Sequence, residues 1–357
     1  MHSVRHLELF SGIGGFRRAF DCLSLDRGFV AECIGFSEID DSATKVYKNF
    51  FDTEDEYEIG DIVKFTENDE NINSLKGFDI LTGGFPCQAF SMMGYQKGFE
   101  DERGNLFFNI TRIIELKRPR YLLLENVRNL VNHDNGNTFS VIKGKLEALG
   151  YHVYYDIFNT SNFDLAQTRN RVYIFCSLTK MPKDFVFSEK RIIESFFKSN
   201  SPSLFHQKNV LDVLEKKVSD KYYLSDRIKP TILANGSGRF SSKSEINQII
   251  ARPLTATMTK MHRACQDNYY SEEFLNSKDP IKYLENNYTK EELAKKRIRR
   301  LTPYEAFALQ GFPRDIVTKS LEIGISEHQL YKQAGNAASV NVIYAILNYL
   351  LFDIKIL

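Results

Sequence analysis

The sequence predicts an α/β protein with a mixed, mostly parallel β-sheet and a smaller, irregular second domain. Over roughly the first 180 residues, apolar runs alternate with helix-like stretches, the pattern of a sheet covered by helices. A glycine-rich turn follows the first apolar run, at residues 10–15. After Lys180 the alternation stops, and polar, lysine-rich stretches dominate. The chain is therefore expected to hold one regular and one irregular domain.

Each expected strand is a short apolar run bounded by turn residues. The six runs lie at residues 6–10, 30–37, 78–81, 121–124, 151–158 and 171–177. Helices are expected at residues 15–23, 41–50, 105–116 and 138–149. A later helix begins at Thr302, because Thr302, Pro303 and Glu305 have the order of a capping box. Residues 341–351 form a final apolar helix.

The composition indicates a folded protein without a membrane segment. Hydrophobic residues make up 43% of the 357 residues, charged residues make up 26%, and no tract is strongly biased. No apolar stretch is long enough to cross a bilayer, and no signal peptide precedes the first strand. The five cysteines include no Cys-x-x-Cys pair, so neither a zinc site nor a disulfide framework is expected. We expect a soluble, cytoplasmic protein.

Positive charge is concentrated in the second half of the chain. Residues 177–327 contain 26 lysines and arginines against 19 acidic residues, a net charge of +7 in a chain of net charge +1. Such a basic segment favours a polyanionic partner, although ordinary surface charge is the alternative.

The turn at residues 10–16 (Phe-Ser-Gly-Ile-Gly-Gly-Phe) has the composition of a cofactor-binding loop. Its glycines let a nucleotide-like cofactor approach the backbone. Glu38 ends the next strand, where a carboxylate can bind ribose hydroxyls, and Asp61 suits an adenine amino group. A dinucleotide and S-adenosylmethionine both fit, but the third dinucleotide glycine would fall at Arg17 or Arg18, which weakens that alternative.

Cys87 is the candidate nucleophile. It follows Pro86 in a glycine-flanked loop after an apolar run, where ligands bind in open α/β sheets. A thiolate is a soft nucleophile that can add to an electron-poor ring carbon. Three other cysteines are interpreted as small buried apolar residues, namely Cys22, Cys33 and Cys176.

Glu125 and two arginines complete the candidate chemistry. Glu125 ends an apolar strand, where desolvation is expected to raise its pKa and suit it to donate a proton to a ring nitrogen. Arg169 and Arg171 alternate on an extended segment, so both guanidinium groups are expected to point the same way. The alternatives are a turn-capping acid and a solvated arginine pair.

Together these segments resemble the C5-cytosine DNA methyltransferases of bacterial restriction–modification systems. The family motifs occur in order, as Phe-x-Gly-x-Gly-Gly at 10–15, Pro-Cys-Gln at 86–88, Glu-Asn-Val at 125–127 and Gln-x-Arg-x-Arg at 167–171. Residues 300–303 with 310–313 and residues 333–338 are similar to the last two family segments. Two mild departures are Glu8, where the family usually has Asp, and Ser11, where Ala is common.

The resemblance implies a Rossmann-like, S-adenosylmethionine-dependent methyltransferase domain. Cys87 would add to C6 of cytosine with Glu125 acting at N3, and C5 would then attack the methyl group of S-adenosylmethionine. Loss of the C5 proton would expel the thiol. Arg171, with Arg169, would hold the cytosine O2 and a neighbouring phosphate. The implied cofactor contacts, with no metal, are Phe10, Gly12, Gly14, Gly15, Glu38, Ile39, Asp61, Ile62, Pro86, Asn336 and Ala337.

Double-stranded DNA is the implied substrate, and the target cytosine must be flipped out of the helix. Residues 88–104 resemble the family loop that closes over DNA, and residues 235–242 and 251–261 are the expected base-reading loops. The expected DNA contacts are Gln88, Ser91, Lys97, Arg103, Arg239 and Arg252.

The resemblance also implies a discontinuous large domain. Residues 1–189 and 327–357 would form the catalytic, cofactor-binding domain, and residues 190–326 the target-recognition domain and hinge. A monomer is expected, with a cognate restriction endonuclease as a separate partner. Three alternatives remain: a transfer RNA methyltransferase, a nicotinamide oxidoreductase and an inactive DNA-binding relative. No second proline precedes Pro86 and no Cys-Phe-Thr segment occurs, which disfavours the first.

Overall fold

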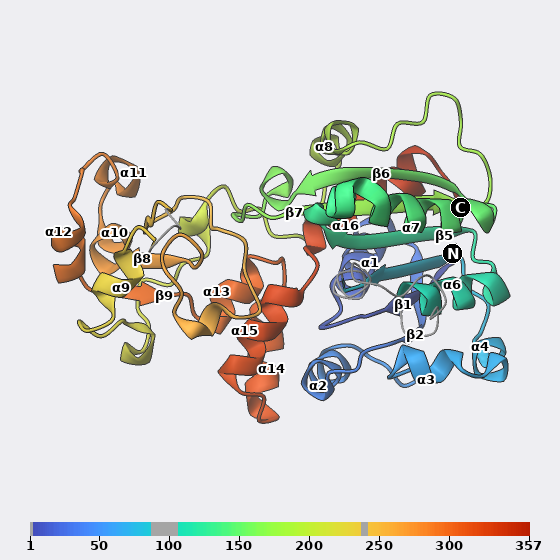
Figure 1. The fold of residues 1–357 in the computed structure, drawn as a ribbon, viewed down its shortest axis with the longest axis horizontal. Coiled ribbons are helices and arrows are strands. Elements are labelled where there is room, and N and C mark those ends of the chain that lie inside the picture. The colour runs from blue at the N-terminus through green and yellow to red at the C-terminus, as the bar shows by residue number, and fades with distance from the viewer. Residues whose placement is uncertain (1–2, 87–105, 237–241) are drawn as a thin grey trace. The chain divides into compact units, whose positions relative to one another are not determined.

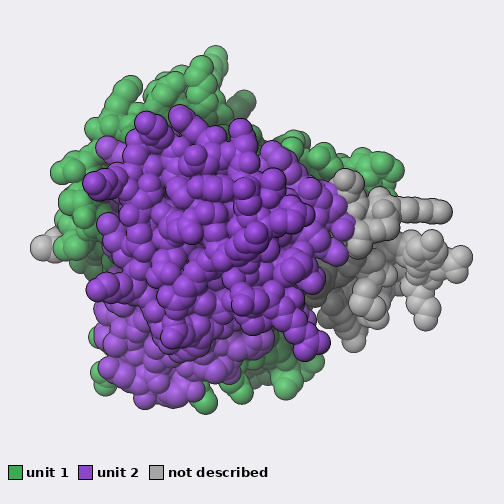
Figure 2. All heavy atoms as spheres, turned by 90° about the vertical axis from the view of Figure 1, so that its left-hand side faces the viewer, with its two compact units in different colours: residues 1–159, 170–204, 338–357 green, residues 160–169, 205–337 purple. Residues whose placement is uncertain are grey.

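The computed structural model describes residues 3–86, 106–236 and 242–357 (Figure 1). The chain divides into two compact units, which Figure 2 colours green and purple. Unit 1 consists of residues 1–159, 170–204 and 338–357, and unit 2 of residues 160–169 and 205–337.

Within its described part, unit 1 contains a seven-stranded sheet of order β3-β2-β1-β4-β5-β7-β6. β7 runs antiparallel to both of its neighbours, and the other adjacent pairs are parallel. This confirms the expected mixed, mostly parallel sheet. The strands are β1 Ser3–Leu9, β2 Val30–Phe36, β3 Tyr57–Glu58, β4 Ile80–Gly84, β5 Tyr121–Val127, β6 His152–Asn159 and β7 Asn170–Ser177.

Helices cover both faces of the sheet because side chains alternate along each strand. On β1, Leu7 and Leu9 belong to the apolar cluster that includes Ile110 and Ile113 of α6. His6 points to the other face and stacks on Phe20 of α1, with ring centroids 4.0 Å apart. The unit 1 helices are α1 Gly15–Arg27, α2 Asp41–Phe50, α3 Ile62–Thr66, α4 Asp69–Ser74, α6 Leu106–Lys117, α7 Asn137–Ala148, α8 Glu189–Lys198 and α16 Val340–Asn348.

The apolar helix α16 packs against α1, and each of its residues is buried. By length and composition, the helical stretch Glu327–Asp353 would also suffice to cross a membrane. However, 83% of its apolar window is buried inside the protein, which is the property of a core helix.

Unit 2 contains short elements joined by long irregular segments. Its small core includes Leu224, Ile232, Tyr269 and Ile298. The expected capping box is confirmed, because the Thr302 side chain accepts from Glu305 N and the Glu305 carboxylate accepts from Thr302 N. The main elements are α9 Lys229–Leu233, β8 Tyr269–Ser271, α10 Glu272–Asn276, α11 Pro280–Tyr283, α12 Lys290–Lys295, β9 Ile298–Arg300, α13 Pro303–Ala308, α14 Arg314–Glu322 and α15 Glu327–Asn336.

The unit boundaries differ from the domain boundaries expected from the sequence. Residues 190–204 lie in unit 1, because α8 packs against α16 and β6. Residues 160–169, which connect β6 to β7, lie in unit 2, where Thr168 N donates to Ala251 O at 2.8 Å. Residues 327–337 also lie in unit 2, as α15 packs against α13.

Candidate active site

The glycine turn between β1 and α1 adopts a conformation that requires its glycines. Gly12 and Gly14 have φ values of 54° and 83°, in the left-handed region. A Cβ atom on Gly14 would lie 2.3 Å from the Phe51 ring, and one on Gly15 would lie 2.7 Å from the Ala338 carbonyl oxygen. A Cβ on Gly12 would meet nothing within 4 Å. The turn is therefore packed on one side and open at Gly12.

The Glu38 carboxylate is bound to this turn. Its Oε2 accepts from Gly12 N at 2.8 Å, and its Oε1 accepts from Ile39 N at 2.9 Å and Asp40 N at 2.8 Å. A carboxylate has about four acceptor positions, so these three bonds fix its orientation and leave acceptor capacity for a ligand hydroxyl. The Ile39 side chain beside it is 74% exposed and offers apolar surface.

Asp61 lies at the start of α3, after β3. Its Oδ1 accepts from Val63 N at 2.9 Å, which orients the carboxylate as the N-cap of this helix. Gly60 before it has a φ of 65°, and a Cβ there would meet nothing within 4 Å. Open space therefore lies next to an oriented carboxylate in two places, at Gly12 beside Glu38 and at Gly60 beside Asp61. Two such carboxylates fit a nucleoside, one for its ribose diol and one for its amino group.

Glu8 supports the first turn of α1 from within unit 1. Its Oε1 accepts from Phe16 N at 3.2 Å, and its Oε2 accepts from Tyr47 Oη at 3.3 Å. Burial raises the pKa of this carboxyl to about 8, although the nearby Arg17 guanidinium lowers it. Glu8 therefore holds a proton through most of the neutral range.

Glu125 and Arg171 form an ion pair on the adjacent strands β5 and β7. Arg171 Nε lies 2.9 Å from Glu125 Oε1, and both side chains are mostly buried. Gly84, the last residue of β4, pairs with Glu125 in the sheet. A Cβ on Gly84 would lie 3.1 Å from Glu125 Oε2, so glycine gives the carboxylate room at this position. The pair therefore lies beside the strand that leads to Cys87.

Asn126 is a buried contact of this site that sequence reasoning did not assign. Its Nδ2 donates to Phe85 O at 2.8 Å, and its side chain is 2% exposed. Phe85 is buried and Pro86 is exposed, so Asn126 fixes the backbone two residues before Cys87. The signal available in the sequence was its place next to Glu125 at the end of a strand.

Several predicted site residues lie outside the residues that the structure describes. They are Cys87, Gln88, Ser91, Lys97, Arg103 and Arg239. In the described ranges, no group of three or more His, Cys, Asp or Glu side chains could hold a metal ion.

Arg169 and Arg171 lie in different units and have different partners. Arg169 is 2% exposed and donates to the backbone carbonyls of Leu254, Gly335 and Ala337, all in unit 2. Arg171 contacts Glu125 in unit 1. The expectation that both guanidinium groups point the same way assumed one continuous strand, but β7 begins at Asn170 and does not include Arg169.

The family model described as C-5 cytosine-specific DNA methylase matches residues 4–351 of the chain. The chain belongs to this family. It is a DNA methyltransferase that acts on C5 of cytosine, as the motifs had indicated.

Known relatives of this C-5 cytosine-specific DNA methylase include type II methyltransferases. M.SsoII of Shigella sonnei is 36% identical, over 96% of this chain and 78% of the relative. M.HhaI of Haemophilus parahaemolyticus is 31% identical, over 98% and 94%. Among solved structures, S. pombe Dnmt2 methyltransferase superposes with a TM-score of 0.71 at 21% identity, covering 98% of each chain, which supports the fold.

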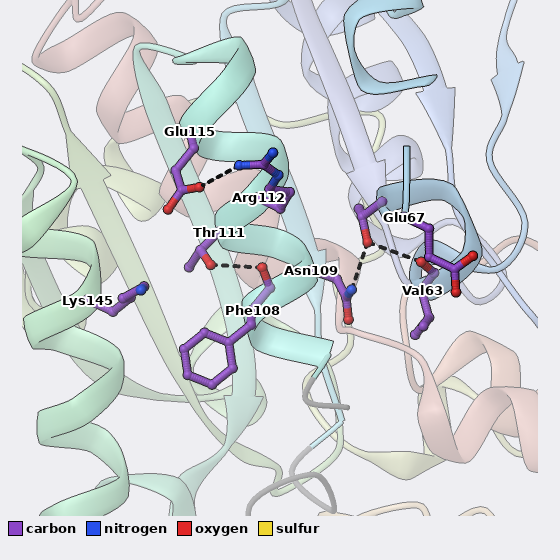
Figure 3. Close-up of a pocket in the computed structure, with 9 residues that line it drawn as sticks. Val63, Glu67, Phe108, Asn109, Thr111, Arg112, Glu115 and Lys145 are labelled. Carbon is purple, nitrogen blue, oxygen red and sulfur yellow. Dashed lines mark hydrogen bonds and ion pairs between the residues drawn. The ribbon is translucent and has the colours of Figure 1, made fainter. Parts of the chain in front are cut away.

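A cavity of about 640 Å³ lies in unit 1 of this methylase. It is bounded by residues of α3, α6 and α7, and Figure 3 shows Arg112 paired with Glu115. Arg112 also pairs with Asp69. None of the predicted catalytic or cofactor residues lines it. The lining residues are Val63, Thr66, Glu67, Phe108, Asn109, Thr111, Arg112, Glu115 and Lys145.

Of the remaining predicted residues of the methylase, Phe10 and Ile62 lie in unit 1, and Asn336, Ala337 and Arg252 lie in unit 2. Asn336 ends α15, and Ala337 follows it. Arg252 is half-buried: its Nε donates to Ala264 O at 3.0 Å, and its guanidinium lies 3.7 Å from Glu245. Arg252 is therefore anchored within the segment that contains the expected base-reading loops.

Proposed function

We propose that this methylase modifies a cytosine within one short sequence of double-stranded DNA, through a covalent bond between Cys87 and C6. The observation that carries the proposal is the Glu125–Arg171 pair, 2.9 Å apart and beside Gly84, the strand end that precedes Cys87 by three residues. A carboxyl and a guanidinium held together suit the N3 and O2 edge of cytosine.

These side chains would activate a ring carbon that is otherwise a poor nucleophile. The Cys87 thiolate forms an Sγ–C6 bond. The C5=C6 electron pair becomes a C4=C5 double bond, and the C4=N3 electron pair moves onto N3. Glu125 delivers a proton to N3, while Arg171 holds O2, so no uncompensated charge builds up in the buried site. C5 is then enamine-like. After methyl transfer, a base takes the C5 proton, the freed electron pair restores the C5=C6 double bond, and the Sγ–C6 bond breaks so that the Cys87 thiolate leaves. N3 then returns its proton to Glu125.

S-adenosylmethionine is the cofactor that fits the turn, and when bound it supplies an electrophilic methyl group. Glu38 would accept from the ribose hydroxyls, and Asp61 from the adenine amino group. Gly12 leaves the backbone accessible, and Gly14 and Gly15 let the rest of the turn pack closely. Phe10, Ile39 and Ile62 are the proposed apolar contacts. Pro86, Asn336 and Ala337 complete the proposed set.

The substrate requires further contributions from the chain. A stacked cytosine cannot reach Cys87, so the base must be flipped out. The loop that contains Gln88, Ser91, Lys97 and Arg103 would close on the DNA, and Arg239 and Arg252 would contact it from unit 2. The enzyme would act as a monomer in the cytoplasm, and, since its relatives are type II methyltransferases, it would protect DNA from a separate endonuclease.

The first experiment incubates the purified protein with labelled S-adenosylmethionine and mixed genomic DNA, followed by bisulfite sequencing. We expect 5-methylcytosine within one short sequence. Label that enters transfer RNA instead of DNA would contradict the DNA substrate, and methylation without sequence preference would contradict the site specificity.

A further inference from the structure

Gln167 and Arg169 are two polar side chains of the Gln-x-Arg-x-Arg motif. Both side chains are almost completely buried in unit 2, at 0% and 2% exposure. Their position in the Gln-x-Arg-x-Arg motif suggests contact with the cytosine, but their hydrogen bonds lead elsewhere.

Both side chains bind the backbone of Leu254. The Gln167 Oε1 accepts from Leu254 N at 2.9 Å, and an Arg169 nitrogen donates to Leu254 O at 3.0 Å. Backbone bonds extend the contact, because Ala251 N donates to Ala166 O and Thr168 N donates to Ala251 O, each at 2.8 Å. Residues 166–169 therefore bind both the N–H and the C=O groups of Ala251 and Leu254.

Leu254 is the buried anchor of the loop that follows it. Residues 255–261, called the recognition loop from here on, become exposed at Thr257 and Lys260. They include the short 3-10 helix Met258–Lys260. A loop with a fixed first residue and exposed polar side chains is suited to present those side chains to a base edge.

The same two side chains connect the recognition loop to the end of α15 and to α13. The second terminal nitrogen of Arg169 donates to Gly335 O at 3.0 Å and to Ala337 O at 3.1 Å, where its positive charge also complements the helix C-terminus. The Gln167 amide donates to Leu309 O at 2.9 Å. A Cβ on Gly335 would lie 2.2 Å from the Thr255 carbonyl carbon, so only glycine lets α15 pack this closely against the loop.

We infer that Gln167 and Arg169 are positioning residues for DNA recognition, which fix the recognition loop against the segment 335–337. The inference rests on the proposed function, since it takes DNA as the substrate of this loop. Arg169 then acts on affinity and sequence discrimination, and the contact with the cytosine belongs to Arg171.

Arg169→Lys tests this inference, with Arg299→Lys as the matched control. Arg299 is also buried in unit 2 and also donates to backbone carbonyls, those of Arg300 and Glu215, and it pairs with Glu305. None of these three partners lies in the recognition loop. Thermal unfolding first establishes that each variant folds. Steady-state methylation is then measured on a duplex that carries the mapped site and on duplexes with one base pair of that site changed.

We expect Arg169→Lys to raise the KM for DNA about tenfold and to lower discrimination between matched and changed sites severalfold. Its kcat at saturating DNA should remain within about threefold of the wild type, and Arg299→Lys should keep the wild-type discrimination. A fall in kcat with unchanged KM would overturn the inference and return Arg169 to the reacting base.

Gln167→Met provides a second variant, because it keeps the side-chain length and removes both amide hydrogen bonds. The same loss of discrimination is expected. Misfolding of both Gln167→Met and Arg169→Lys, with Arg299→Lys folded, would overturn the inference in favour of a purely structural role. Absence of DNA methylation by the wild type would instead refute the proposed function, so the two failures are distinguishable.

Discussion

Glu125 and Arg171 show how one side-chain contact can prepare a site for a base. Their ion pair at 2.9 Å keeps a mostly buried carboxylate compensated until a substrate arrives. In Glu125→Gln the amide keeps the shape but cannot deliver a proton. We expect kcat to fall by about 10²- to 10⁴-fold, while DNA affinity changes little. Single-turnover methylation and filter binding measure the two quantities. Glu115→Gln, an exposed substitution on α6, is the control, and an equal loss there would contradict this role.

Cys87 can be tested through the bond that it is proposed to form. A duplex with 5-fluorocytosine at the target position has no C5 proton to lose, so the Sγ–C6 bond should persist after methyl transfer. The wild type should give a complex that survives denaturing electrophoresis. Cys87→Ala should give none and should lose all turnover, but it should still bind DNA and cofactor. Cys265→Ala removes the one partly exposed thiol among the described cysteines and should behave like the wild type. Turnover by Cys87→Ala would exclude the covalent mechanism.

The buried Glu8 carboxyl predicts a pH dependence of the protein's folding stability. Its pKa is about 8 in the folded protein, against an ordinary value of 4.5. Between these values the folded state keeps a proton that the unfolded chain has released, so stability falls as the pH rises, by up to about 1.4 kcal/mol per pH unit. Glu8→Gln keeps both hydrogen-bond positions and removes the titration. Relative to the wild type, the variant should therefore gain stability from pH 5.5 to pH 8.5.

Urea unfolding of Glu8→Gln and the wild type at both pH values measures this difference. Comparing the two proteins cancels other titrating groups, such as Asp267, whose pKa burial raises to about 6. Parallel stability curves would show that Glu8 is not protonated in the folded state.

At the scale of elements, alanine substitutions at Gly12 and Gly28 distinguish the effect of backbone strain from the effect of ligand contact. Gly12 and Gly28 both have positive φ values, 54° and 70°, and a Cβ on either would meet nothing within 4 Å. Alanine should therefore destabilise the protein at both positions by about 1 kcal/mol. Only Gly12→Ala should also weaken S-adenosylmethionine binding, because its Cβ would enter the proposed cofactor space. Calorimetric titration of the two variants measures this, and equal affinities would place the cofactor elsewhere.

The sequence predicts the elements of unit 1 well because apolar periodicity sets them. All six expected strands occur, with ends shifted by a few residues, and α2 matches residues 41–50. β3 was not expected, because it has two exposed residues and no apolar alternation. Its pairing with β2 is a backbone contact, which leaves no pattern in the side chains.

The candidate site was less predictable where backbone groups supply the partners. Glu125 and Arg171 could be expected together, since the family motifs place both residues at the cytosine. The hydrogen bond from Arg169 to the Leu254 carbonyl could not be expected. Every residue has a backbone carbonyl, and only the fold determines which one Arg169 binds. The assignment of residues 160–169 to unit 2 depends on such contacts too.

At the scale of the whole molecule, charge differs between the two units. Unit 2 contains 23 lysines and arginines against 17 acidic residues, a net charge of +6, which leaves −5 for unit 1 in a chain of net charge +1. If unit 2 carries the DNA contacts, the logarithm of DNA affinity should fall linearly with the logarithm of salt concentration.

Lys260→Gln, in the recognition loop, should reduce the steepness of this salt dependence by about one if Lys260 contacts a phosphate. Lys64→Gln, an exposed substitution on α3 in unit 1, should leave the slope unchanged. Fluorescence anisotropy over a salt series measures both slopes. An equal change in the two variants would argue against a specific contact by the recognition loop.

The packing of α16 against α1 has a consequence for how the enzyme is made. Arg27 Nε donates to Asn348 Oδ1 across 321 residues of chain, and the Ala338 carbonyl lies against Gly15. At roughly 5–20 residues per second, a ribosome needs on the order of half a minute to add the residues between them. During that interval the apolar face of α1 waits without its partner, so a nascent chain should engage chaperones and remain unable to modify the genome until α16 emerges.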